Sequence, residues 1–476
     1  MLTNKNGRFS FVMSKQNNAK DSILHGNVFK TMLSLSIPAI LGMVVIGLYN
    51  FMDAVFVGRM VGPEAMTAVK VSYPFTLMNT GVATLIGTGS ASVLSRAIGK
   101  NDKKTIDTIM GNLVALILLF SLVITAVGMI FTPNLLGLAG AKGDILTEAN
   151  RYLKVVFIGS LFVNFSQSAN MVMRGEGKLK IAMAIMGAGA ILNIILDPVM
   201  ITLMGKENGI LGAAYATITS QIVQAIFTLW YFLKKSDNVR INRVKIDGTL
   251  VKPVLGVGVS AMLMQVMTMV QQTIMYNTVE RWGSGNWQTI LGAGLSLQAF
   301  AFIPLWGISQ GFQPAIGTNY GAKNYSRVRA FTKTFMIAAT VLALVFYVPI
   351  MLAPETMLSM FITDSAIVAE GAPMLRVLFS MYIAYGVLIL AITFFQAVGK
   401  GGAAALMALL RQAVLFLPLV VILPRFFAHN VEGVFYAQMI TDAVVLVIGI
   451  IFMAVSFKAM RAEEIRANND IKEIAA

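Results

Sequence analysis

Long apolar runs alternate with short polar connections from residue 31 to residue 457. A helix needs about 20 residues to cross the ~30 Å hydrocarbon layer of a membrane, and each run is long enough. Backbone groups find no water in that layer, so apolar runs of this length are expected to be helical. The pattern predicts twelve spans: 31–59, 68–97, 106–131, 146–172, 181–204, 209–233, 251–279, 289–319, 330–353, 366–396, 401–424 and 431–457.

Composition supports this all-α, polytopic membrane fold. Hydrophobic residues make up 57% of the chain and charged residues 12%, against about 25% charged in soluble proteins. The chain has no cysteine and two histidines, which excludes a disulfide framework, a thiolate metal site and a multi-histidine cluster. The first 30 residues lack the apolar core of a signal peptide and are expected to form a cytoplasmic tail.

The net charge of +15 first suggests a nucleic-acid partner, but the positions of the basic residues give another explanation. Most lysines and arginines lie in the two tails and in alternate connections, with a dense group at 234–252. Such residues mark the cytoplasmic side of a membrane protein. We therefore predict a multi-pass protein of the cell membrane with both termini cytoplasmic and no nucleic-acid partner.

An internal repeat divides the chain. "AIGKND" around Gly99 matches "NYGAKN" around Gly321, and in the same register "MVMRGEGK", which ends at Lys178, matches "TFFQAVGK", which ends at Lys400. Six spans separate equivalent points, so the halves share one orientation, as in transporters built from parallel repeats. The repeat predicts a tail (1–30), an N-terminal six-helix lobe (31–234), a cytoplasmic linker (235–250), a C-terminal lobe (251–458) and a second cytoplasmic tail (459–476), with the lobes around a central cavity.

Two carboxylates interrupt the apolar spans. An aspartate at the centre of a spanning helix costs about 2.5–3.5 kcal/mol on insertion scales, which makes Asp53 and Asp197 candidates for function. Helical spacing places Asn50 on the face of Asp53 and Asn193 on the face of Asp197, and Thr217 lies at a similar depth. Oxygen donors of this kind suit a proton or a Na⁺ ion. The alternatives are structural: Asp197 capping a kinked helix, or Asp53 bonding across helices.

The repeat favours the functional interpretation. The register that pairs Gly99 with Gly321 also pairs Asp53 with Met275 and Asp197 with Leu419. A fold that needed these acids for packing would be expected to need them in both lobes. Asp442, in the last span, corresponds to Gln221 when the register shifts by one residue, as in the match of "GAAYAT" from Gly212 with "GVFYAQ" from Gly433, and the sequence indicates no partner for it.

A methionine-rich face on the seventh span is a candidate surface for binding substrate. Methionine is flexible and polarizable, which suits diverse apolar ligands, although a packing or lipid-facing stripe is an alternative. The surface comprises Met264, Met267, Gln271 and Met275, to which we add Gln167 of the fourth span.

Several enzyme classes are excluded by missing motifs. The chain contains no GxxxxGK[ST] and no HExxH, and no polar region is large enough for a nucleotide-binding domain. We therefore expect neither an enzyme nor an ATP-driven pump, and no cofactor other than a coupling H⁺ or Na⁺.

The chain resembles the multidrug and toxic compound extrusion (MATE) transporters, nearest to DinF-like and MepA-like bacterial members. The resemblance rests on "MDAVFVGRMVG", "SRAIGKND", "RGEGK", "NIILDP", "GILGAAYAT" and "QAVGK". It implies two six-helix bundles that alternate between outward- and inward-open states, and antiport of cationic amphiphilic drugs against H⁺ or Na⁺ by a protein expected to be a monomer. Carried over by position, the family's cation site falls on Asp53, Asn193, Asp197 and Thr217.

The chain departs from members that carry carboxylates in spans 7 and 10, so coupling in its second lobe is not expected. The leading alternative function is a flippase for lipid-linked precursors, or a polysaccharide exporter of the same architecture. A flippase would be expected to carry a cationic cavity for pyrophosphate, but the predicted spans contain few basic residues.

Overall fold

The computed structural model describes residues 18–236, 238–283, 285–427 and 430–475, and the regular elements in these ranges are all helices. The first half contains α2 (Asn18–His25), α3 (Val28–Phe56), α4 (Pro63–Lys100), α5 (Lys103–Leu138), α6 (Gly143–Ile158), α7 (Ser160–Gly175) and α8 (Leu179–Trp230). The second contains α9 (Gly248–Trp282), α10 (Gly285–Gly321), α11 (Tyr325–Leu352), α12 (Pro354–Ser359), α13 (Ser365–Phe379), α14 (Tyr382–Ala397), α15 (Gly401–Leu409), α16 (Phe416–Ile422) and α17 (Glu432–Ala475). Short π-helical turns lie at η1 (Val57–Val61), η2 (Tyr231–Lys235) and η3 (Leu410–Val414), and a 3₁₀ turn at η4 (Leu423–Arg425).

Ten helical segments of the described chain are long and apolar enough to cross a membrane, and the pair α6 and α7, bent by 54°, makes an eleventh. The remaining predicted span, 68–97, coincides with α4, which is as long as the others but more polar. Its polar side chains, among them Ser72, Asn79 and Ser92, are buried against neighbouring helices rather than facing lipid. The prediction of an all-α, multi-pass membrane protein is confirmed.

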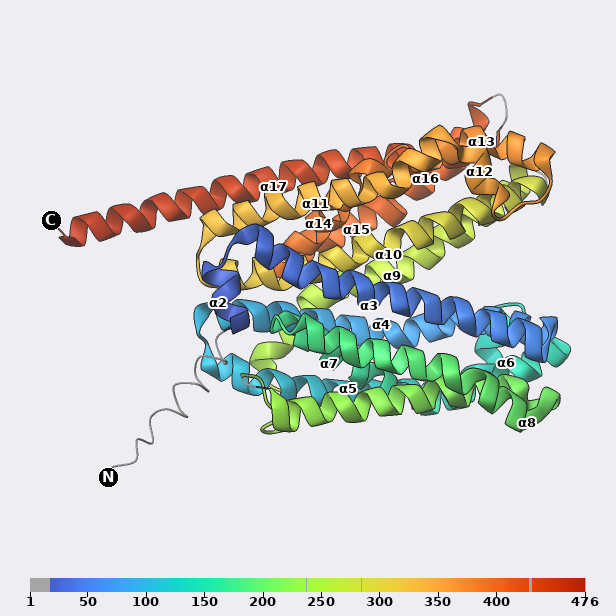
Figure 1. Ribbon diagram of the computed structural model, residues 1–476, viewed down its shortest axis with the longest axis horizontal. Helices are drawn as coiled ribbons and strands as arrows, with labels where there is room; N and C mark the ends of the chain where they lie inside the picture. Colours follow the sequence, from blue (N-terminus) through green and yellow to red (C-terminus); the bar gives the residue numbers. More distant parts are fainter. Residues whose placement is uncertain (1–17, 237, 284, 428–429, 476) are drawn as a thin grey trace.

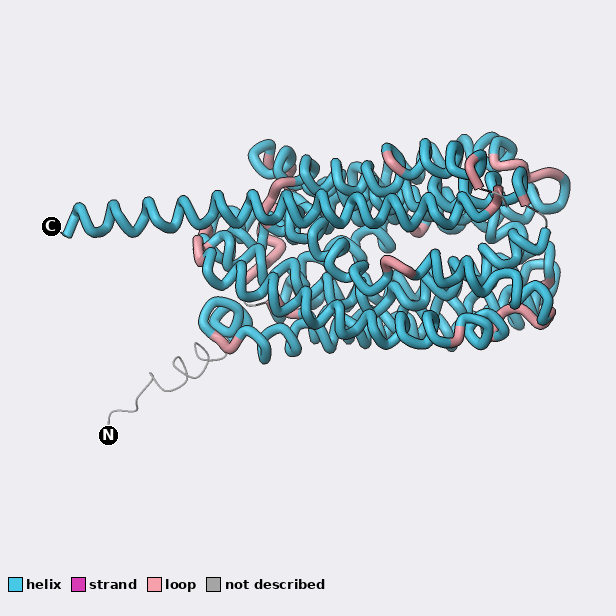
Figure 2. The backbone as a smooth tube through the Cα atoms, turned by 90° about the horizontal axis from the view of Figure 1, so that it is seen from above, coloured by secondary structure: helices cyan, strands magenta, loops and turns pink. Residues whose placement is uncertain are grey.

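The helices form two groups that lie side by side along their length, as Figure 1 and the perpendicular view in Figure 2 show. We call α3–α8 the N-lobe and α9–α17 the C-lobe. Helix α2 and the end of α17 lie at the same end of the molecule, which we call the terminal end. Helix α17 continues to Ala475, so the predicted C-terminal tail extends the last spanning helix.

Close backbone contacts join the two lobes at the terminal end. A Cβ atom at Gly99 would collide with the carbonyl oxygen of Thr318, and one at Gly321 would collide with that of Arg96. The repeat pairs Gly99 with Gly321 and Arg96 with Thr318, so these two contacts are reciprocal. Only glycine permits so close an approach of two backbones.

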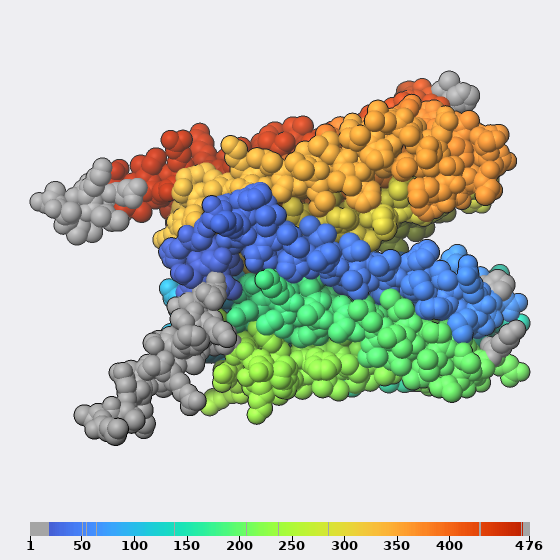
Figure 3. Space-filling model, in the orientation of Figure 1, coloured from blue at the N-terminus to red at the C-terminus, as the bar shows by residue number. Residues whose placement is uncertain are grey.

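The lobes diverge toward the opposite end, where Figure 3 shows an open space between them. Helix α2 adds a further link at the closed end. Arg327 of the C-lobe donates hydrogen bonds to the carbonyls of Ile23 (3.0 Å) and Gly26 (2.7 Å), and Lys20 donates to Asn101 of the N-lobe. The molecule is therefore closed at its terminal end and open at the other.

Candidate functional site

A cluster of acidic and polar side chains lies inside the N-lobe, toward its open end. Asp53 comes from α3, and Asn193 and Asp197 come from the first half of α8. Gly205, with φ +71°, breaks α8 and lets its second half return alongside the first, which brings Thr217 to Asn193. Asn193 Nδ2 lies 3.3 Å from Asp197 Oδ1 and 3.4 Å from Thr217 Oγ1. The structure thus brings together four of the predicted cation-site residues.

The cluster contains buried acceptor atoms without a partner. Asp197 and Asn193 are 0% and 1% exposed, and Asp53 is partly buried. Asp197 Oδ2 and Asn193 Oδ1 have no hydrogen-bond partner among the described residues. Leaving a buried acceptor unsatisfied costs about 1–3 kcal/mol, and more for a charged group. Protonation would give Asp197 Oδ2 a hydrogen to donate, and a small cation would use oxygens of this kind as ligands.

The donor chemistry fits a hard cation. Hard cations bind carboxylate, amide and hydroxyl oxygens, which this cluster supplies. The described residues contain no group of three or more His, Cys, Asp or Glu side chains that could hold a metal ion. A bound Na⁺ would therefore depend on the two carboxylates, completed by neutral oxygens of Asn193 and Thr217. The side chain of Asn50, the fifth predicted member, lies outside the described residues.

Two tyrosines that were not among the predicted site residues complete the cluster. Tyr49 lies within hydrogen-bonding reach of Thr217 and close enough to Asp53 and Asp197 to interact with both electrostatically. Tyr152 of α6 also lies within electrostatic range of the two carboxylates. Tyr49 precedes Asp53 by four residues, a spacing that could have identified it. No pattern in the sequence links Tyr152 to α3 or α8.

The structural alternatives for the two acids gain no support from the geometry of the described residues. Asp197 accepts its hydrogen bond from the side chain of Asn193, so it does not cap a backbone N–H. Helix α8 continues through Pro198, whose carbonyl accepts a hydrogen bond from Thr202 at 2.7 Å. Neither acid forms an ion pair with a described residue. Asp442, by contrast, pairs with Arg411.

The predicted methionine face is divided between the interior of the C-lobe and its boundary. Met275 is 1% exposed within the C-lobe core, and Gln271 is also buried. Met264 and Met267 are partly buried, as is Gln167 on α7 of the other lobe. In this arrangement of the lobes, Gln271 and Met275 contact the C-lobe interior rather than the space between the lobes. The 3.6-residue periodicity identified one face of α9 but not the direction in which it points.

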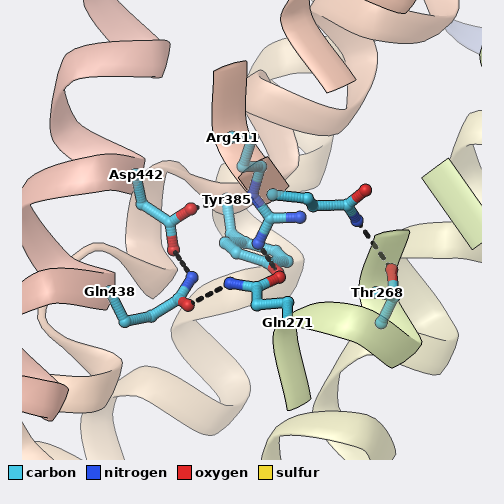
Figure 4. Close-up of polar contacts among 7 residues, drawn as sticks. Thr268, Gln271, Tyr385, Arg411, Gln438 and Asp442 are labelled. Carbon is cyan, nitrogen blue, oxygen red and sulfur yellow. Dashed lines mark hydrogen bonds and ion pairs between the residues drawn. The ribbon is translucent and has the colours of Figure 1, made fainter. Parts of the chain in front are cut away.

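A second polar cluster lies inside the C-lobe and neutralises its own charge (Figure 4). Arg411 Nε lies 2.8 Å from Asp442 Oδ1, and Gln438 Nε2 donates to Asp442 Oδ2 at 2.8 Å. Gln271 Nε2 donates to Gln438 Oε1 at 2.5 Å. Arg411 also donates to the hydroxyl of Tyr385 and stacks over its ring at 4.6 Å. Asp442 therefore has the partner that the sequence did not indicate, and it is not available to a cation.

Arg411 itself was missed because it lies within an apolar run. An intramembrane arginine is as costly as an aspartate, so the position of Arg411 in the span before that of Asp442 was an available signal. The two lobes thus differ in charge. The N-lobe holds two carboxylates with no ion-pair partner among the described residues, whereas the C-lobe acid is paired.

Comparison with known proteins agrees with this architecture. The MatE family model matches residues 38–199 and 260–422. The multidrug export protein MepA of Staphylococcus aureus strain MRSA252 is 26% identical over 420 residues, covering 87% of this chain and 91% of that protein. MepA of Staphylococcus saprophyticus is 26% identical over 422 residues, covering 88% and 92%.

Solved structures of the same kind superimpose on nearly the whole chain. A MATE protein crystallised with MaD3S has a TM-score of 0.87 at 25% identity, covering 93% of this chain and 98% of that one. The outward-facing conformation of a multidrug resistance MATE transporter has a TM-score of 0.86 at 25% identity, covering 92% and 98%. The chain therefore belongs to the MatE family, the multidrug and toxic compound extrusion transporters that its motifs resemble.

Proposed function

We propose that this protein exports small organic compounds, chiefly cationic amphiphiles, across the cell membrane in exchange for H⁺ or Na⁺. The observation that carries the proposal is the pair of carboxylates in one lobe, each without an ion-pair partner among the described residues, beside the unsatisfied oxygens of Asn193 and Asp197. The names of the MepA relatives as multidrug export proteins support export of drugs, and the preference for cations is part of the proposal. With both termini in the cytoplasm, the open end of the molecule faces outward.

The coupling follows from the linkage of two ligands to one conformational equilibrium. A ligand shifts a two-state equilibrium only by its differential affinity for the two states. A cation that occupies Asp53 and Asp197 would favour one arrangement of the lobes, and a bound drug would favour the other. Entry of one then drives exit of the other, by reciprocal coupling.

The test is transport by the purified protein in liposomes, with a pH gradient or a Na⁺ gradient imposed separately. We expect accumulation of a fluorescent organic cation to depend on one of the two gradients and to stop when an ionophore collapses it. Asp197→Asn should abolish this dependence, because an amide does not ionise at ordinary pH. Glu207→Gln is the matched control, since it removes an exposed N-lobe carboxylate outside the cluster. Wild-type export that ignores both gradients would refute the proposal.

A further inference from the structure

Polar side chains continue from the N-lobe cluster toward the closed terminal end. On α7, Ser166, Asn170 and Arg174 follow one another at intervals of four residues and so occupy one face of the helix. Their exposed fractions are 2%, 1% and 6%. A charged or amide side chain is rarely buried in this way without a partner or a function.

The second half of α8 carries the matching row of Thr217, Gln221 and Gln224. Ser166 Oγ and Gln221 Oε1 are 2.9 Å apart, which joins the two rows. Gln224 occupies the space beside Gly189, where a Cβ atom would collide with its Nε2. We call Thr217, Gln221, Gln224, Ser166, Asn170 and Arg174 the polar row.

The polar row ends at the interface between the lobes. Asn170 Nδ2 donates to the carbonyl of Ala182 at 2.7 Å, and Arg174 Nη1 donates to Gln310 Oε1 of α10 at 2.6 Å. Arg174 Nε and Asn170 Oδ1 have no hydrogen-bond partner among the described residues. Because Gln310 belongs to the C-lobe, separation of the lobes at this end would remove the partner of Arg174.

The repeat shows that the fold does not require polar side chains at two positions of this row, whereas Arg174 and Gln221 correspond to polar residues, Gln396 and Asp442. In the register that pairs Gly99 with Gly321, Ser166 corresponds to Leu388 and Asn170 to Ile392 on α14 of the C-lobe. Both C-lobe residues are buried, at 2% and 3% exposure. These two positions are therefore apolar in the C-lobe, where Asp442 is paired, and polar in the lobe that holds Asp53 and Asp197.

We propose that the polar row is the route by which the coupling cation leaves the Asp197 cluster for the cytoplasmic side, and that Arg174, held by Gln310, closes the route. This inference rests on the proposed antiport. Hydroxyl and amide groups spaced one helical turn apart, with water, offer successive partners to a cation or a proton. A guanidinium at the end of the row opposes passage of another positive charge, as arginines do in selective pores. Opening of the terminal end frees Arg174 from Gln310 and lets water reach the row.

The first test interrupts the row at Asn170. Asn170→Leu places at this position a residue as apolar as its counterpart Ile392, and we expect drug-driven cation flux in liposomes to fall about tenfold, equivalent to about 1.4 kcal/mol of added barrier. Equilibrium drug binding and its dependence on pH or Na⁺ should stay at wild-type values, because the cluster is intact. Ile392→Leu is the matched control, and Ser166→Ala is a milder second interruption expected to slow flux less. Wild-type flux in both Asn170→Leu and Ser166→Ala would overturn the route.

The second test removes the closing charge. In liposomes without drug, Arg174→Ala should let the coupling cation leak down its gradient. Arg174→Lys should show no such leak, because lysine keeps the positive charge. Adding Asp197→Asn to Arg174→Ala should stop the leak, since the route begins at that carboxylate. A leak that persists in the double variant would place the pathway between the lobes and overturn the inference. Failure of the antiport itself would appear separately, as wild-type export that depends on neither gradient.

Discussion

Replacing Asp442 with leucine is expected to lower the free energy of unfolding by about 3–5 kcal/mol, the cost of leaving a buried charge without its partner. Arg411 is 7% exposed, and Asp442 supplies the carboxylate at 2.8 Å from its Nε. The substitution also removes the acceptor of the Gln438 amide at 2.8 Å. Asp442→Asn should cost less, because an amide oxygen can still accept one of these hydrogen bonds.

The double variant Arg411→Leu with Asp442→Leu distinguishes charge burial from simple loss of packing. Replacing both members of a buried pair with apolar residues is often neutral or stabilising, so most of the lost stability should return. The cation–π contact with Tyr385 is lost in the double variant, at a cost of about 0.5–2 kcal/mol. Equilibrium unfolding in mixed micelles measures these differences. A single variant that loses less than about 1 kcal/mol, or a double variant no more stable than the single one, would refute the reasoning.

Four further predictions concern other parts of the molecule. Asp53→Asn is expected to abolish drug-driven counterflow of H⁺ or Na⁺ without loss of expression, and normal coupled export would remove Asp53 from the cluster's function. Met275→Ala should reduce unfolding free energy by about 2–5 kcal/mol, because this side chain is buried in the C-lobe core; wild-type stability with a changed range of drugs would instead place Met275 in the binding surface. Gly99→Leu should keep the lobes apart at the terminal end, since its Cβ would meet the Thr318 carbonyl, and spin labels on introduced cysteines in this cysteine-free chain would detect the change; unchanged distances would contradict it. Hydrogen bonds from the Thr105 side chain and backbone hold the pKa of Asp102 below its usual value, so this cap should stabilise the start of α5 at neutral pH and weaken as pH falls through the lowered pKa; protection of the first α5 amides, measured relative to their intrinsic exchange rate at each pH, that does not fall at acid pH would count against it.

The sequence alone determined the helical spans and the contact between Asn193 and Asp197, because both depend on local chemistry. Apolar runs of about 20 residues are helical in a membrane whatever surrounds them, and the predicted spans coincide with helical segments of the structure. The spacing of Asn193 and Asp197 on one helix likewise predicted their contact, which the structure gives as 3.3 Å. Helix α4 fits less well, since its polar residues are buried by other helices and not by lipid.

Only the tertiary structure decided which partner each polar side chain meets. Asp442 and Arg411 both interrupt apolar runs, but their ion pair depends on how α17 packs beside η3. Tyr152 reaches the acids because α6 packs against α8. The direction of the methionine face on α9 depends on the orientation of that helix about its own axis, which is set by its packing between α4 of the N-lobe and α15 of the C-lobe. Spacing along one helix fixes relative directions within it, whereas the rotation of a helix against its neighbours comes from the packing of all of them together.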